Sequence, residues 1–157
     1  GTNSMTGERI LRLRKHLEGD ENFLLTYGDG VSNLNIKNVI NYHLKHKKIA
    51  TMTAVRPPVK FGELTIGKNN RVKKFVEKPQ LKKGWINGGF FVLNKKIFKY
   101  LKGNNLVFEK KPLSKLCKDG ELRAYVHNGY WRCMDNLNEK NQLEEIFKKK
   151  KTIWKIK

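Results

Sequence analysis

Residues 23–31 read Phe23-Leu24-Leu25-Thr26-Tyr27-Gly28-Asp29-Gly30-Val31. Apolar and β-favouring residues run into an aspartate between two glycines, which predicts a buried strand that ends in a turn without bulky side chains. In open α/β sheets, ligands bind just beyond the carboxyl ends of strands, where glycines allow a close approach to the backbone. A carboxylate there can hold Mg²⁺ on phosphate oxygens. A plain tight turn is the alternative interpretation of the same tripeptide.

The segment after this turn predicts a helix and a second strand. Asn35 is a candidate N-cap, and the apolar residues behind it share one helix face: Ile36, Val39, Ile40 and Leu44. Residues 49–55 then form a β-favouring run with apolar residues on both faces. A strand, a helix and a strand in this order predict a βαβ unit whose two strands are parallel. The fold class expected is therefore α/β.

Strand-like and helix-like segments alternate along the rest of the chain. The strand expected over 85–93 contains Gly88 and Gly89, which predict a bulge or a group lying against the backbone. With no repeat and no linker, residues 1–157 are expected to form a single domain. The remaining expected elements are a helix carrying Ile10, Leu13 and Leu17, a hairpin of 63–66 and 71–76, short helices over 95–101 and 112–118, a strand over 121–126 and a final helix from Leu137.

The composition is strongly basic, with 34 Lys+Arg against 14 Asp+Glu and a formal net charge of +20. Such a balance raises nucleic acid or an anionic surface as partners. Only seven of the basic residues are arginines, and the lysines are spread along every segment rather than gathered among aromatics. We therefore interpret most of them as a solvated surface and expect no nucleic-acid partner, with a basic nucleic-acid binder as the remaining alternative.

Membrane and disulfide signals are both weak. No apolar run approaches the ~20 residues needed to cross a bilayer. The lysines at 148–151 and Trp154 could touch an anionic membrane, but a solvated helix end is the preferred interpretation, so no membrane partner is expected. Cys117 and Cys133 are the two thiols, and no secretory signal accompanies them, which favours a reducing cytoplasm without a disulfide framework.

Several polar groups end or interrupt expected strands: Asp29, Glu77 with Lys78, Asn87 and Asp135. One sheet could bring them to a common edge. Two carboxylates and a lysine suit nucleotidyl transfer, because the acids can hold Mg²⁺ on a triphosphate while the ammonium holds an attacking phosphate. A surface ion pair is the alternative for Glu77 and Lys78, and a helix cap is the alternative for Asp135. The four histidines share no ligand spacing with an acid or thiol.

Five short motifs, in this order, resemble the sugar-phosphate nucleotidyltransferase family, and the match is closest to its cytidylyltransferases. They are Met5-Thr6-Gly7-Glu8-Arg9, Thr26-Tyr27-Gly28-Asp29-Gly30-Val31, Glu77-Lys78-Pro79, Ile86-Asn87-Gly88-Gly89-Phe90-Phe91-Val92, and Gly129-Tyr130-Trp131 with Met134-Asp135. The resemblance covers nearly the whole chain. It implies a Rossmann-like nucleotidyltransferase fold with a mixed sheet flanked by helices, and a cytoplasmic enzyme of surface-polysaccharide (O-antigen dideoxy sugar) synthesis.

The resemblance also implies the reaction and the site. The phosphate of α-D-glucose 1-phosphate would attack the α-phosphorus of CTP, giving CDP-glucose and pyrophosphate, with Mg²⁺ as cofactor. Asp29 and Asp135 match the metal ligands, and with Lys78, which matches the sugar-phosphate lysine, they are the expected catalytic residues. The substrate-binding residues implied are Ser4, Thr6, Arg9 and Gly28 for the nucleotide, and Glu77, Lys78, Asn87 and Gly88 for the sugar. The family forms multimers, so a homo-oligomer is possible.

The sequence departs from the family in three places. Glu8 stands where a second glycine is common, which puts an acid near the triphosphate, and Arg132-Cys133 replaces a Gln-Pro pair. The Gly-rich loop Gly-Gly-x-Gly-Thr-Arg and the Pro-Lys-Pro segment, which hold the nucleotide phosphates, do not occur in these residues. We therefore expect the C-terminal part of the enzyme, lacking the first strands of the sheet and turning over little by itself. A non-catalytic sugar-nucleotide binding module is the alternative.

Overall fold

The structure is a computed structural model that describes residues 3–17, 19–57, 63–77 and 84–149. Its contacts divide the chain into two compact units. The first consists of Gly1–Gly28, Asn35–Thr53 and Gly89–Val126, and the second of Asp29–Leu34, Ala54–Gly88 and His127–Lys157. Every helix among the described residues is too short or too polar to cross a membrane.

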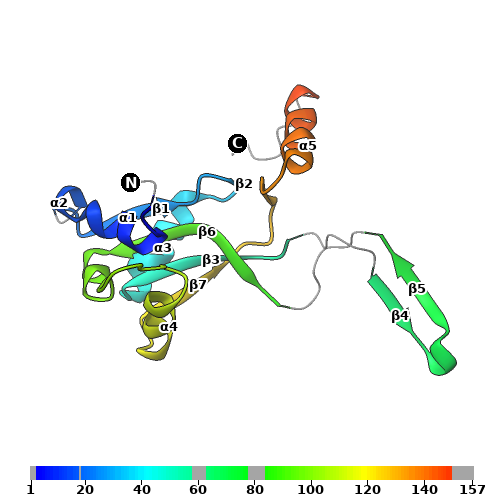
Figure 1. The fold of residues 1–157 in the computed structure, drawn as a ribbon, viewed down its shortest axis with the longest axis horizontal. Coiled ribbons are helices and arrows are strands. Elements are labelled where there is room, and N and C mark those ends of the chain that lie inside the picture. Colours follow the sequence, from blue (N-terminus) through cyan, green and yellow to red (C-terminus); the bar gives the residue numbers. More distant parts are fainter. Residues whose placement is uncertain (1–2, 18, 58–62, 78–83, 150–157) are drawn as a thin grey trace. The chain divides into compact units, whose positions relative to one another are not determined.

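The first unit is built on a four-stranded sheet with the strand order β1-β6-β3-β7 (Figure 1). Helices precede, connect and follow these strands. The bounds are α1 (Thr6–Arg12), α2 (Arg14–Leu17), β1 (Asn22–Thr26), α3 (Ile36–His46), β3 (Ala50–Val55), β6 (Ile86–Asn94), the 3₁₀ helix η2 (Lys95–Lys99), α4 (Lys111–Lys118) and β7 (Leu122–Val126).

The sheet is mixed. β1 and β6 are antiparallel, with Asn22 opposite Asn94 and Thr26 opposite Phe90. The N–H of Asn94, the last residue of β6, donates to the carbonyl of Ile49 just before β3, so β6 and β3 also run in opposite directions. β1 and β3 therefore point the same way, as the strand–helix–strand pattern predicted, but β6 lies between them. The α/β fold class with a mixed sheet is confirmed.

The hydrophobic core of the first unit is formed by the sheet and the elements that follow β6. Phe91 and Leu93 of β6 are buried against Phe108, and the Phe91 and Phe108 rings meet edge to face at 5.5 Å between centroids. Ile97 of η2 and Leu116 of α4 are fully buried in the same cluster. Burying aromatic and branched side chains of this size is the main stabilising contribution to a unit of this kind.

A buried polar network joins α3 to β3 and β1. Nδ1 of His43 lies 2.9 Å from Oγ1 of Thr51, and Nε2 of His43 lies 3.0 Å from Oδ1 of Asn22. His46 reaches the same Thr51 hydroxyl at 2.7 Å. Burial of His43, with the nearby His46 adding to the effect, lowers its pKa from 6.5 to about 4. The ring is therefore neutral at pH 7, and the network is part of the packing of the first unit.

The second unit contains two antiparallel strand pairs and a helix. β2 (Gly30–Ser32) pairs with β8 (Trp131–Cys133), and β4 (Glu63–Ile66) pairs with β5 (Val72–Val76) across the 3₁₀ turn η1 (Lys68–Asn70). Asn69 and Asn70 adopt positive φ values in that turn, a conformation that asparagine tolerates better than most residues. Helix α5 (Leu137–Lys148) follows β8.

Three sequence expectations need correction. The first helix begins at Thr6 rather than near Ile10, and it is interrupted at Leu13, so that α2 is a separate turn. The element after β6 is a 3₁₀ helix rather than a longer helix over 95–101. Strands β2 and β8 were not predicted, because each has only three residues and is too short to show a periodic pattern.

Candidate functional site

Asp29 and Asp135 lie at the same end of the β2–β8 ladder. Gly30 is opposite Cys133 in this antiparallel pair, so the residue before β2 meets the residues after β8. The backbone N–H of Met134 donates to the carbonyl oxygen of Asp29 at 3.0 Å. The structure thus brings together the two chain segments that carry the predicted metal ligands.

Asp135 is held at the start of helix α5. Its backbone N–H donates to Oε2 of Glu139 at 2.8 Å, and its own Oδ2 accepts from Sγ of Cys133 at 3.4 Å. The N-cap of α5 is Asn136, whose side chain accepts from the N–H of Glu139 at 3.0 Å. The alternative interpretation of Asp135 as the helix cap is therefore wrong, because the next residue has that role.

One ligand atom from each of Cys133, Asp135 and Glu139 lies within 4.8 Å of the others, and these are the only such group among the described residues. Carboxylate oxygens are the ligands that Mg²⁺ prefers, so the Asp135 and Glu139 side chains fit this ion, whereas a thiol suits softer metals. Glu139 was not among the predicted site residues. Glu139 follows Asn136 by three residues, a pattern typical of a helix N-terminus, and this pattern could have singled out Glu139 in the sequence.

The start of β6 is attached to the same ladder. Nε1 of Trp131, in β8, donates to the carbonyl oxygen of Gly88 at 2.8 Å. Gly88 is buried and its neighbour Asn87 is half-buried. Two of the predicted sugar-binding residues are thus fixed to the strand that leads to Asp135.

Gly129 allows this part of the second unit to pack closely. A Cβ atom at this position would lie 2.4 Å from Oδ1 of Asn33 and 2.6 Å from the His127 ring. The His127 ring in turn lies 3.1 Å from Oγ of Ser32, which donates to the carbonyl of Tyr130. A larger residue at this glycine of the Gly-Tyr-Trp motif would displace the Asn33 and His127 side chains, which is a structural reason for its presence.

Glu77 and Lys78 complete the set expected around the sugar. Glu77 is exposed at the end of β5, and Lys78 lies outside the described residues. Their predicted roles as sugar-hydroxyl acceptor and sugar-phosphate lysine stay predictions.

Ser4, Thr6, Arg9 and Gly28 belong to the first unit. Ser4 is buried, and its carbonyl oxygen accepts from Nε of the exposed Arg9 at 3.0 Å. The Thr6 hydroxyl donates to Oε2 of Glu109 at 2.7 Å and accepts from the N–H of Phe108 at 2.9 Å. The hydroxyl expected to bind substrate thus makes two hydrogen bonds within the protein.

Glu8 also has a structural role. Its Oε2 accepts from the N–H of Met5 at 2.9 Å, and its Oε1 accepts from the N–H of Asn105 at 2.8 Å. These bonds, the backbone bond to Met5 first, lower the pKa of Glu8. Gly7 beside it donates to the carbonyl of Leu106 at 2.8 Å, where a Cβ would be only 2.7 Å from the Leu106 side chain. The Thr-Gly-Glu-Arg motif therefore anchors α1 to the loop at 105–109.

The strand end before Asp29 is fixed by Tyr27. Its hydroxyl donates to Oε1 of Glu109, and its ring lies against Gly89, where an added Cβ would be 3.0 Å from the ring. Burial acts to raise the pKa of Glu109, but the hydrogen bonds from Tyr27 and Thr6 outweigh it and lower this pKa. An ionised Glu109 thus holds Tyr27 next to Gly28, whose own Cβ position faces open space. The predicted contact at a glycine of β6 is confirmed at Gly89.

Comparison with known proteins places the chain in a family. Residues 6–140 match the nucleotidyl transferase family model. The chain is 44% identical to glucose-1-phosphate cytidylyltransferase of Salmonella typhimurium and 41% identical to the probable glucose-1-phosphate cytidylyltransferase of Bacillus subtilis, covering 99% of this chain in both cases. It spans 60% and 61% of the length of these curated relatives.

Solved structures of two proteins have folds similar to that of this chain. HddC from Yersinia pseudotuberculosis superposes with a TM-score of 0.67 at 26% identity, covering 91% of this chain and 62% of that protein. A putative glucose-1-phosphate thymidylyltransferase from Bacillus anthracis has the same TM-score at 18% identity, covering 91% and 61%. From the family model and this fold, we conclude that the chain belongs to the nucleotidyl transferase family.

Proposed function

We propose that this chain provides the sugar-binding and metal-binding part of an enzyme that makes CDP-glucose from CTP and α-D-glucose 1-phosphate. One observation carries the proposal: the β2–β8 ladder joins the segments of Asp29 and Asp135 by the Met134–Asp29 hydrogen bond. Its support from known proteins is the 44% identity to a glucose-1-phosphate cytidylyltransferase over 99% of the chain.

In the proposed reaction, a phosphate oxygen of glucose 1-phosphate forms a bond to the α-phosphorus of CTP. The bond between the α-phosphorus and the bridging oxygen breaks, and pyrophosphate leaves with that electron pair. No general base is required, because the sugar phosphate is already an anion at neutral pH. Mg²⁺ bound by Asp29 and Asp135 would neutralise charge on the triphosphate. Lys78 would hold the attacking phosphate, and Glu77 with Asn87 and Gly88 would orient the sugar.

Nucleotide binding is assigned to Ser4, Arg9 and Gly28 in this proposal, with Thr6 beside them. The exposed Arg9 guanidinium is tied to the Ser4 carbonyl through Nε, and a planar guanidinium with donors left over suits phosphate. The Thr6 hydroxyl is the weakest member, since Glu109 and Phe108 already use it. The cytoplasm is the proposed compartment, surface polysaccharide the proposed destination of the CDP-glucose, and a homo-oligomer the proposed assembly.

The test is binding of CDP-glucose with and without Mg²⁺, measured by calorimetry on the 157-residue chain. We expect Mg²⁺-dependent binding, and at least about tenfold weaker binding in Asp29→Asn and in Asp135→Asn, because each change removes one proposed ligand charge. Asp119→Asn is the matched control, since Asp119 pairs with Tyr100 and Lys115 in the first unit. Equal, metal-independent binding by all variants would rule the metal site out.

Turnover is measured separately, as CDP-glucose formation with and without a supplied N-terminal segment of the Salmonella relative. We expect little turnover by the 157 residues alone, because they contain no Gly-rich phosphate loop. Binding without turnover under both conditions would select the non-catalytic sugar-nucleotide binding module instead.

A further inference from the structure

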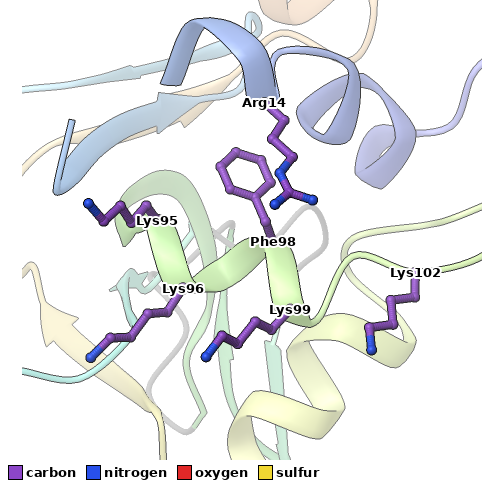
Figure 2. A pocket seen from close by; sticks show the side chains of 6 residues that line it. All are labelled: Arg14, Lys95, Lys96, Phe98, Lys99 and Lys102. Atoms are coloured by element: carbon purple, nitrogen blue, oxygen red, sulfur yellow. The ribbon is translucent and has the colours of Figure 1, made fainter. Parts of the chain in front are cut away.

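An open depression with a volume of about 480 Å³ lies in the first unit, and none of the residues assigned above is in its lining. Its lining consists of five cations and one aromatic ring (Figure 2). The lining residues are Arg14, Lys95, Lys96, Phe98, Lys99 and Lys102. No acidic side chain is among the described residues that line it, and all five cations are exposed.

The lysines are aligned by the local backbone. Lys96 and Lys99 belong to η2, and a 3₁₀ helix has three residues per turn, so side chains three apart are stacked on one edge. Figure 2 shows these two side chains extending in the same direction from the helix. Lys102 continues the spacing of three just beyond the helix. Lys96 and Lys99 thus form a row of like charges, and Lys102 adds a further cation to the lining.

This row is only partly neutralised. Lys95 pairs with Glu21 at 3.1 Å. After the hydrogen bond from Asn94, this pair and the nearby charge of Lys96 lower the pKa of Glu21. Within the described part of the chain, no ion pair involves Lys96, Lys99 or Lys102. Like charges at this spacing repel one another, so an anion placed among them would be attracted by several cations at once.

The support beneath the cations is well packed. Ile97 and Phe98 of η2 are buried, and the side chain of Asn94 caps the helix by accepting from the N–H of Lys96 at 3.0 Å. The Arg14 guanidinium lies over the Phe98 ring, 5.7 Å from its centroid. Phe98 is 6% exposed and already covered, so it offers no face on which a base could stack.

We propose that this depression binds a small anion that carries two or more phosphate groups. The concave form favours a small molecule over a flat membrane or an extended nucleic acid, and the lack of an open aromatic face favours recognition of phosphate rather than of a base. Lys96 and Lys99 are the central contacts, with Arg14, Lys95 and Lys102 around them. The site uses none of the residues assigned to the metal-dependent site and does not depend on the proposed reaction.

The experiment is calorimetric titration of the 157-residue chain with inorganic pyrophosphate, in a chelator and without Mg²⁺. Because two charged contacts to the anion are lost and replaced by like charges, Lys96→Glu with Lys99→Glu should weaken binding by more than about tenfold. The control is Lys37→Glu with Lys45→Glu, which changes the net charge equally on the exposed face of α3 and should leave binding within about twofold. If the variant with two glutamates does not fold, Lys96→Gln with Lys99→Gln is tested instead, because it removes the two charges without reversing them.

Further variants and probes distinguish binding at this depression from a general charge effect and from binding of a larger anionic partner. Asp29→Asn with Asp135→Asn should bind pyrophosphate as the unchanged chain does, because the depression uses neither residue. Equal weakening by the α3 control would mean a general charge effect and would overturn the proposal. Binding of a single-stranded oligonucleotide and of vesicles with anionic lipid is measured in the same variants. If the Lys96 and Lys99 changes weaken binding of either probe more than they weaken binding of pyrophosphate, the proposal is overturned in favour of that partner.

Discussion

The backbone N–H of Met134 donates a hydrogen bond to the backbone oxygen of Asp29 over 3.0 Å. This bond closes the β2–β8 ladder at the end where both proposed metal ligands lie, although they are far apart in the sequence. The ladder has only three residue pairs, so its geometry depends on what holds each end. On the β8 side, that support is the start of helix α5.

Glu139→Gln tests this support. The Glu139 carboxylate accepts from the N–H of Asp135 at 2.8 Å and lies in the cluster with Cys133 and Asp135. Loss of the charge should weaken Mg²⁺-dependent CDP-glucose binding by about tenfold, as for partners that orient metal ligands, and should lower the free energy of unfolding by about 1 kcal/mol. Calorimetry and urea unfolding measure the two effects. Glu145→Gln, at an exposed position of the same helix, should change neither, and unaltered binding by Glu139→Gln would remove this residue from the site.

His43 predicts a pH dependence of stability. The unfolded chain binds a proton on this ring below its ordinary pKa of 6.5, whereas the folded chain does so only near pH 4. The free energy of unfolding should therefore be highest above pH 6.5 and fall as the pH drops from 6.5 toward 4, by on the order of 2 kcal/mol for this group. Urea unfolding at several pH values measures the slope.

His43→Gln should reduce the slope of the stability curve between pH 6.5 and 4, since the replacement does not titrate there. His46, whose pKa burial also lowers, should keep a smaller part of the slope. His16→Gln, at an exposed position of α2, should keep the slope of the unchanged chain. Equal slopes in the unchanged chain and in His43→Gln would contradict the assignment.

Gly89→Ala should destabilise the first unit. Gly89 has a φ of +77°, and its added Cβ would meet the Tyr27 ring at 3.0 Å. The left-handed backbone and the close ring together should cost about 1–3 kcal/mol. Thermal unfolding provides the measurement. Gly19→Ala, where nothing lies within 4 Å of the new Cβ, should leave the melting temperature nearly unchanged; similar losses in both variants would show that the Gly89 contact is not the cause.

Tyr27→Phe should lower the free energy of unfolding, because it removes a hydrogen bond to the Glu109 carboxylate. The tyrosine hydroxyl donates to a half-buried carboxylate that Thr6 also binds, and hydrogen bonds to charged groups contribute about 1.5–3 kcal/mol. Tyr100→Phe is the matched control, because its hydroxyl donates to the more exposed carboxylate of Asp119. We expect a clearly smaller loss in the control by urea unfolding. The network would be unimportant if the two variants lost equal stability.

Much of the architecture could be predicted from the sequence because strong local signals produced it. The run at 23–27 became β1, Asn35 became the N-cap of α3, and the polar turn at 67–70 joined β4 to β5. The glycine inside β6 predicted a group against the backbone, and the Tyr27 ring occupies that place. In each case, neighbouring residues carry the whole signal, as capping, periodicity and turn chemistry require.

Other features could not be predicted because their causes are distant in the sequence. The sequence does not show that the Glu8 carboxylate accepts hydrogen bonds from the N–H groups of Asn105 and Met5. Thr6 stays a predicted substrate contact, but the sequence does not show that its hydroxyl also bonds to Glu109 and Phe108. The partner of each polar side chain is chosen by packing, since a hydrogen bond forms with whichever group the fold places within reach.

The sequence by itself determined the α/β class, the order of the longer elements and the family, because periodicity, caps and short motifs are local properties of the chain. Only the tertiary structure decided that β6 lies between β1 and β3, that Asp29 and Met134 meet, and that Lys96 and Lys99 form one row. The physical reason is that strand order, ladder register and 3₁₀ rather than α geometry are set by which surfaces pack together. Local sequence preference leaves these choices open.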